Sequence, residues 1–101
     1  TGGGLPENLP RCLPEGLSAR INASSWPRPA LFQWLQAAGD IPERDLWHTF
    51  NMGIGFCFVV PDGSEEALID HCRSKGREAW VIGDVMPKSV CSDPSITGLP
   101  D

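Results

Sequence analysis

The sequence has 101 residues, a formal net charge of −5, 41% hydrophobic residues and 21% charged residues. This balance is typical of one small globular domain with a modest core. An acidic chain lacks the basic surface that neutralises nucleic-acid phosphates, and no apolar run approaches the roughly 18–20 residues of a membrane span. We therefore expect no nucleic-acid partner and no membrane partner, although a few local donors suffice for one phosphorylated small molecule.

The first half of the chain predicts helical turns, then a strand, then two helices. Residues 5–13 are bounded by prolines and predict one or two helical turns. Residues 17–23 alternate between apolar and polar side chains, with Ser18 on the polar side, which predicts a half-buried strand. Residues 29–38 predict a helix that Gly39 ends in a left-handed conformation.

The helix over 29–38 places its apolar side chains on one face, and this pattern predicts that the face is buried. These residues are Leu31, Trp34, Leu35 and Ala38. Asp40 and Glu43 have the spacing of a capping box, which predicts a second short helix that runs to about Trp47. The tryptophans at 26, 34, 47 and 80 are expected to anchor the core or a domain interface.

The second half predicts strand, helix, strand. Residues 52–60 alternate in a way that buries both faces, as in a central strand. Ser64 predicts the N-cap of a helix that ends near Gly76. Residues 79–85 predict a strand, 87–94 a polar loop, and 96–99 a short edge strand. The fold class is therefore α/β (mixed α+β), a small mixed sheet with helices, with 1–86 as the core and 87–101 as a C-terminal loop and edge strand.

The four cysteines, at 12, 57, 72 and 91, are far apart and form no C-x-x-C motif. We expect reduced thiols in a cytoplasmic protein. His48 and His71 do not complete a ligand spacing with these cysteines, so we predict no metal site in this chain. Of the two histidines, His48 is the better candidate for an acid or base, because His71 falls on a charged helix face.

Two stretches carry candidate chemistry. In "TGGGLPENLPR", successive glycines allow backbone amides to converge on an anion, and Asn8 and Arg11 add polar and charged groups. In "HTFNMGIGF", the pair Thr49 and Asn51 precedes two glycines that permit close approach of a ligand. Bland alternatives remain open: a flexible linker in the first stretch, and tight strand–helix packing in the second.

These stretches, together with "SSW--P-LF-WLQ--G-I" and "G-EAWVIG", resemble the phosphoribosylformylglycinamidine cyclo-ligase family, the aminoimidazole ribonucleotide synthetases of purine biosynthesis. The resemblance implies ATP-dependent closure of the imidazole ring of formylglycinamidine ribonucleotide, with Mg²⁺. It also implies two α/β domains and a homodimer. The family's ATP-binding stretch lies in an N-terminal half that has no counterpart here. We therefore expect an incomplete C-terminal domain that is inactive alone.

The resemblance also implies site residues. They match the two motifs and are expected to hold the substrate's ribose phosphate or the migrating phosphoryl group: Gly2, Gly3, Gly4, Asn8, Arg11, Thr49, Asn51, Gly53 and Gly55. No catalytic base is assigned, because His48 stands where relatives often carry Arg.

Two other hypotheses belong to different classes. The chain is either a stand-alone ribonucleotide- or phosphate-binding module without catalysis, or a structural segment that supports an N-terminal domain. Because part of the family's fold is missing from this sequence, we also expect exposed apolar surface and a tendency to associate.

Overall fold

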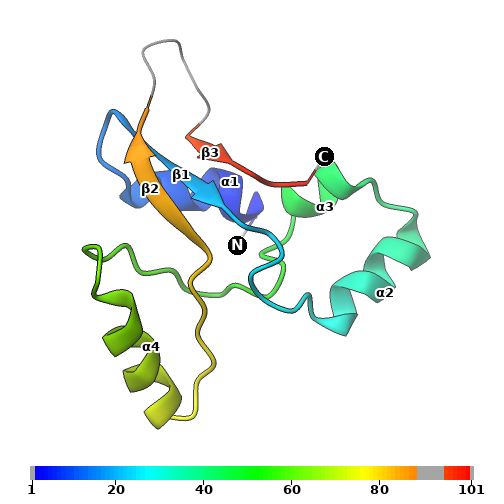
Figure 1. Ribbon diagram of the computed structural model, residues 1–101. Helices are drawn as coiled ribbons and strands as arrows, with labels where there is room; N and C mark the ends of the chain where they lie inside the picture. Colours follow the sequence, from blue (N-terminus) through cyan, green and yellow to red (C-terminus); the bar gives the residue numbers. More distant parts are fainter. Residues whose placement is uncertain (1, 89–94, 101) are drawn as a thin grey trace.

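The computed structural model describes residues 2–88 and 95–100 of the chain (Figure 1). A small sheet lies beside the N-terminal helical turns, and two longer helices lie at opposite ends of the molecule. In chain order the elements are α1 (Gly4–Asn8), the 3₁₀ helix η1 (Leu9–Cys12), β1 (Leu17–Ile21), α2 (Ala30–Gly39), α3 (Glu43–Trp47), α4 (Glu65–Ser74), β2 (Gly83–Pro87) and β3 (Ile96–Thr97).

The sheet has the order β2-β1-β3 and mixes both pairing directions. β2 pairs with β1 antiparallel, with Ile21 opposite Gly83, and β3 pairs with β1 parallel, with Ala19 opposite Ile96. Ala19 and Ile21 are buried, as the alternation predicts. The small mixed sheet with helices confirms the predicted α/β class.

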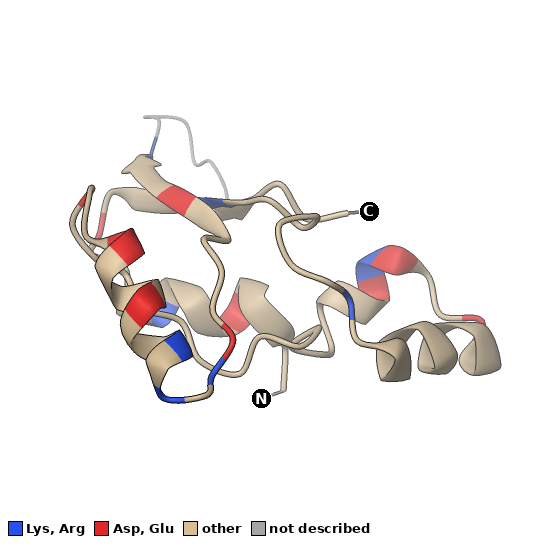
Figure 2. Cartoon of the chain, turned by 60° about the horizontal axis from the view of Figure 1, so that its bottom comes forward, with Lys and Arg blue, Asp and Glu red and all other residues tan. Residues whose placement is uncertain are grey.

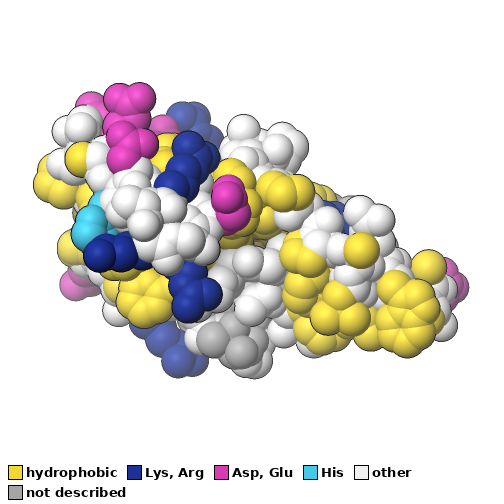
Figure 3. Space-filling model, turned by 90° about the horizontal axis from the view of Figure 1, so that it is seen from below, with side chains coloured by type: hydrophobic (Ala, Val, Ile, Leu, Met, Phe, Trp, Pro, Cys, Tyr) yellow, Lys and Arg dark blue, Asp and Glu magenta, His cyan; other side chains and the backbone are white. Residues whose placement is uncertain are grey.

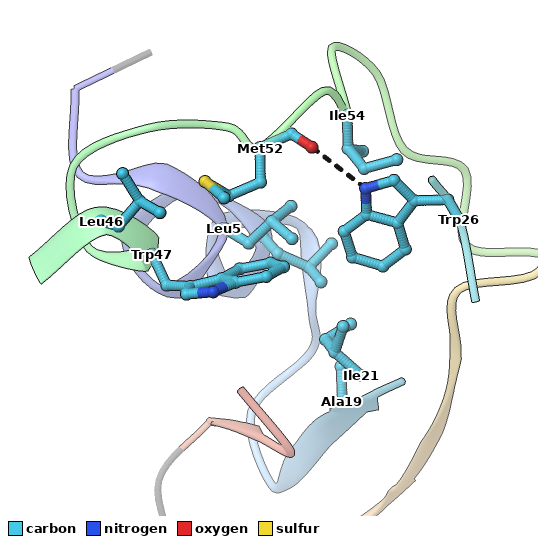
Figure 4. Packing of buried hydrophobic residues seen from close by; sticks show 9 residues of the cluster. Leu5, Ala19, Ile21, Trp26, Leu46, Trp47, Met52 and Ile54 are labelled. Carbon is cyan, nitrogen blue, oxygen red and sulfur yellow. Dashed lines mark hydrogen bonds between the residues drawn. The ribbon is translucent and has the colours of Figure 1, made fainter. Parts of the chain in front are cut away.

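The core lies between the sheet, α1 and α3 (Figure 4). Trp26 and Trp47 meet edge to face, with ring centroids 5.8 Å apart. The indole N–H of Trp26 donates a hydrogen bond of 3.0 Å to the carbonyl of Met52, which ties the turn after α3 to the core. Leu46 in α3 and Met52 in the turn that follows are both completely buried. The segment between them is therefore anchored in the core at both ends.

A polar cluster joins α2 to α3. The guanidinium of Arg28 donates two hydrogen bonds, of 2.9 and 3.0 Å, to the carboxylate of Glu43. The same carboxylate accepts from Gln36 and from the indole of Trp47. The Arg28 hydrogen bonds, with help from Trp47 and Gln36, hold the pKa of Glu43 at about 2 against burial, which acts in the opposite direction.

The strand predicted over 52–60 is wrong. Residues 54–60 adopt no regular structure, and Phe56 and Phe58 are 79% and 60% exposed, with ring centroids 5.0 Å apart. The physical reason is that a strand requires a partner for its backbone N–H and C=O groups. β1 already has a neighbour on each side, and no other described segment pairs with this one.

Several predicted details of the helices are also wrong. Asp40, with φ of 50°, takes the left-handed conformation after α2, whereas Gly39 remains helical. Asp40 therefore cannot cap α3, whose N-cap is Pro42. α2 has no buried residue, and Leu31 and Trp34 are more than half exposed, because no other described element covers that face. Ser64 does stand at the N-cap of α4 but makes no side-chain capping bond.

The remaining differences concern the sheet. β2 begins at Gly83 and not at residue 79, because β1 ends at Ile21 and offers no partner further back. Ser18 is buried, so the predicted polar side of β1 is covered there. The edge strand predicted over 96–99 is present as β3. Most of the loop predicted over 87–94 lies outside the described residues, and the division at residue 86 stays a prediction.

The molecule is flat, with extents of 42 × 40 × 20 Å. Figure 2 shows that α2 carries no charged residue, whereas α4 carries several. Apolar side chains gather at the end of the molecule that α2 forms, and basic side chains gather at the opposite end (Figure 3). Over the described residues, no helix has the length and apolar character needed to cross a bilayer.

Candidate functional site

The glycines before α1 approach another part of the backbone. Gly3 and Gly4 both have positive φ, 88° and 64°, which disfavours any other residue there. A Cβ on Gly4 would collide with the carbonyl oxygens of Trp47 and Phe50. α1 therefore starts directly against the end of α3, and Gly4 is needed for this contact.

Asn8 fixes the glycine-rich stretch from the other end of α1. Its Nδ2 donates hydrogen bonds of 3.0 Å to the carbonyl of Gly2 and 2.7 Å to the carbonyl of Gly4. Because both partners are acceptors, the orientation of the amide is determined. Its Oδ1 remains as an acceptor, and no described residue donates to it.

A tight turn begins the segment that follows α3. Oδ1 of Asn51 accepts a hydrogen bond of 2.8 Å from the backbone N–H of Gly53. Met52 and Gly53 have positive φ, and a Cβ on Gly53 would lie 2.7 Å from the ring of Pro29. This turn directs the following residues past α1 and η1. Nδ2 of Asn51 is left as a donor, without an acceptor among the described residues.

The two motifs meet at one pocket of about 330 Å³. One wall comes from α1 and η1 and the other from the segment after α3. The lining residues are Gly4, Leu5, Asn8, Leu9, Cys12, Asn51, Ile54, Gly55, Phe56 and Cys57. Four of the nine predicted site residues, Gly4, Asn8, Asn51 and Gly55, thus lie around one cavity, although nothing so far tests that they bind a ligand.

Gly55 differs from the other lining glycine. Its φ is not positive, and a Cβ placed on it would meet nothing within 4 Å. The fold therefore has no steric need for glycine at this position, which lines the pocket.

The other five predicted residues lie outside this lining. Gly2 and Arg11 are exposed, and Gly3 has the Glu7 carboxylate against it. Gly53 supports the turn described above. The hydroxyl of Thr49 donates a hydrogen bond of 2.6 Å to the carbonyl of Asp45, within the α3 region.

His48 is not brought to the pocket either. It is exposed, and its Nδ1 lies 2.8 Å from the carbonyl oxygen of Arg44, to which it donates. Among the residues that the structure describes, no acidic or basic side chain is hydrogen-bonded to it.

Six lining residues were not predicted as site residues: Leu5, Leu9, Cys12, Ile54, Phe56 and Cys57. A usable signal existed for Cys57, since residues two apart on an extended chain share a side and Gly55 was a candidate. Cys12 directly follows the candidate Arg11. The apolar members depend on the turn at 51–53, which no sequence pattern specified.

The lining contains no acidic or basic side chain. Amide groups on apolar walls suit neutral polar parts of a ligand, such as hydroxyl or amide groups. Within residues 2–88 and 95–100, no three His, Cys, Asp or Glu side chains come together as metal ligands. These residues therefore fit neither Mg²⁺ nor a triphosphate, and we derive no metal-dependent step from them.

Comparison with known proteins assigns the chain to a family. The family model described as AIR synthase related protein, C-terminal domain, matches residues 1–92. The chain belongs to this family. The matched residues include both walls of the pocket.

Two curated relatives share one name. The phosphoribosylformylglycinamidine cyclo-ligase of Synechococcus sp. (strain CC9605) is 67% identical over 100 residues, which cover 99% of this chain and 29% of the relative. The cyclo-ligase of Prochlorococcus marinus (strain MIT 9313) is 54% identical with the same coverage. The resemblance seen in the motifs is confirmed, and this AIR synthase related domain spans 29% of the length of these relatives.

Proposed function

We propose that this chain forms part of the ribonucleotide site of a phosphoribosylformylglycinamidine cyclo-ligase. The reaction is the ATP-dependent cyclisation of formylglycinamidine ribonucleotide to aminoimidazole ribonucleotide in purine biosynthesis. The names of the relatives support the reaction class. The observation that carries the site is the pocket, where residues of both glycine-rich motifs meet.

The pocket's chemistry suits the uncharged part of this substrate. We expect Nδ2 of Asn51 to donate to a ribose hydroxyl or to the formyl amide oxygen. We expect Oδ1 of Asn8 to accept from a hydroxyl or an amidine N–H. Arg11 is exposed and immediately precedes the lining residue Cys12, so its guanidinium is a candidate phosphate partner at the rim.

On the family resemblance alone, we propose that ATP and Mg²⁺ bind mainly outside these 101 residues and that the protein is a cytoplasmic homodimer. The 101-residue chain is then expected to be inactive by itself.

The test is an exchange of Asn51 for Asp in the intact protein. Asn51→Asp keeps the Oδ1 that accepts from Gly53 but replaces the donor Nδ2 with a negatively charged oxygen. Loss of one hydrogen bond and the added repulsion predict a KM for the ribonucleotide raised by roughly tenfold or more. Steady-state kinetics with formylglycinamidine ribonucleotide and ATP measure this.

Asn22→Asp is the matched control. Asn22 makes the same kind of turn, with Oδ1 accepting 3.1 Å from the N–H of Ser24, but it lies outside this pocket. Its KM should stay unchanged. Equal KM values for both variants would count against the proposed site.

A ribonucleotide-binding module without catalysis is a second candidate, favoured because the two glycine-rich motifs meet at one pocket within this chain. A measurement of turnover distinguishes the binding module from the cyclo-ligase. If the intact protein binds the ribonucleotide but forms no aminoimidazole product with ATP, the binding module replaces the cyclo-ligase.

A further inference from the structure

Two thiols lie in the lining of the candidate pocket, one on each wall. Cys12 is the last residue of η1, and Cys57 lies two residues beyond Gly55. Cys72, on α4, is not part of the lining. The fold thus brings together two cysteines that are far apart in the sequence, and both carry free thiols.

The two thiols differ in environment. Cys12 is exposed, and its thiol donates a weak hydrogen bond of 3.2 Å to the carbonyl of Leu9. Cys57 is half-buried. Burial raises the pKa of the Cys57 thiol, and the nearby charge of an ionised Cys12 raises it further. An oxidant from solvent therefore meets the exposed Cys12 before the half-buried Cys57.

We propose that Cys12 and Cys57 form a paired thiol-modification site, at which a low-molecular-weight disulfide such as oxidised glutathione links their sulfurs across the pocket. The Cys12 thiolate attacks one sulfur of the oxidant, forming a mixed disulfide and releasing one glutathione thiolate. Cys57 then attacks the Cys12 sulfur, forming the internal disulfide and releasing the second. The two cysteine protons end on two glutathione thiols, and two electrons pass from the protein to the oxidant.

The consequence for binding rests on the proposed function. Both cysteines line the same pocket of about 330 Å³. A bond across it joins the wall from η1 to the wall from residues 54–57. We expect the disulfide to lower ribonucleotide affinity at least tenfold, and reduction with a dithiol to restore it.

The experiment treats the intact protein with oxidised glutathione and maps the link without reduction. Cleavage after glutamate places Cys12, Cys57 and Cys72 on separate peptides, 8–15, 44–65 and 67–78. The expected product joins 8–15 to 44–65 with a mass two hydrogens below the sum of the two peptides. Cys57→Ser should stop at a glutathione adduct on Cys12, Cys12→Ser should form no internal link, and Cys72→Ser should behave as the unaltered protein.

Peptide masses test the disulfide link, and ribonucleotide binding tests its effect on the pocket. A stable glutathione adduct on Cys12 without the internal link, or a link through Cys72, would overturn the site. An internal link that leaves ribonucleotide affinity unchanged would overturn the closing of the pocket. If the reduced protein binds no ribonucleotide while the link still forms, the proposed function fails and the thiol pair stands.

Discussion

The two motifs contain glycines with different physical constraints, as Gly4 and Gly55 show. Gly4 has positive φ and lies against the carbonyls of Trp47 and Phe50, so the fold itself requires it. Gly55 has neither constraint and borders the pocket. A glycine that the fold does not require is the stronger indication of a ligand.

Alanine at these two positions should separate fold from site. Gly4→Ala forces a left-handed alanine and a backbone collision, so the free energy of unfolding should fall by about 2 kcal/mol or more. Gly55→Ala should change it by less than about 0.5 kcal/mol. Urea unfolding of the two variants measures both, and an equal loss at both positions would refute the distinction.

At the level of elements, α2 and α3 are held together by polar contacts more than by burial. α2 has no buried residue, and its link to α3 runs through Arg28, Gln36 and Glu43. The Glu43 carboxylate is the centre of this cluster.

Glu43→Gln removes the ion pair and should lower the free energy of unfolding at pH 7 by about 1–2 kcal/mol. Because the pKa of Glu43 falls from an ordinary 4.5 to about 2 on folding, the carboxylate stabilises the fold above pH 4.5. This contribution is lost as the pH falls toward 2, where the variant and the parent should converge.

Asp84→Asn is the control, since Asp84 forms an exposed ion pair with Arg20 at 2.9 Å. Exposed pairs contribute little, so the loss should stay below about 0.5 kcal/mol. Urea unfolding between pH 2 and 7 gives both curves. A Glu43→Gln effect that persists unchanged at pH 2 would contradict the assigned pKa.

The sequence predicted elements best where the pattern is local. Residues 17–21 and 65–74 follow from alternation and from helical spacing with an N-cap serine. The strand over 52–60 failed because pairing is not local. The predicted end of α2 was wrong because Asp40, and not Gly39, adopts the left-handed conformation.

The same division holds for the site. Polar and glycine residues such as Asn8, Asn51 and Gly55 could be predicted from the motifs, because the residue type itself indicates what each can bind. The apolar and thiol lining was not, because it depends on how the turn at 51–53 lays Ile54 and Phe56 against α1 and η1.

On the scale of the whole molecule, the chain is thin and leaves large apolar side chains in solvent. Leu31, Trp34, Phe56 and Phe58 are each 59% exposed or more. Single apolar residues on a surface are ordinary. Four large exposed apolar side chains on a molecule only 20 Å thick mean that much of the apolar surface lies outside the core. The exposure agrees with the expectation from the sequence, and the association expected from it stays a prediction.

The 101-residue chain should therefore self-associate in a concentration-dependent way. The double variant Phe56→Ser, Phe58→Ser removes two adjacent exposed rings and should shift the chain toward monomer. Ala67→Ser, at an exposed position of α4, is the control and should leave association unchanged. Sedimentation velocity over a range of concentrations measures this, and a parent chain that stays monomeric throughout would contradict it.

The most direct test of the proposed site is calorimetric binding of formylglycinamidine ribonucleotide to the intact protein and to its Gly55→Val variant. Gly55 lines the pocket and a Cβ there would meet nothing within 4 Å, so we expect valine to reduce the space of the pocket without disturbing the fold. We predict an unchanged unfolding transition and an affinity weakened by roughly tenfold or more. Unchanged affinity in a folded Gly55→Val protein would show that the ribonucleotide binds elsewhere.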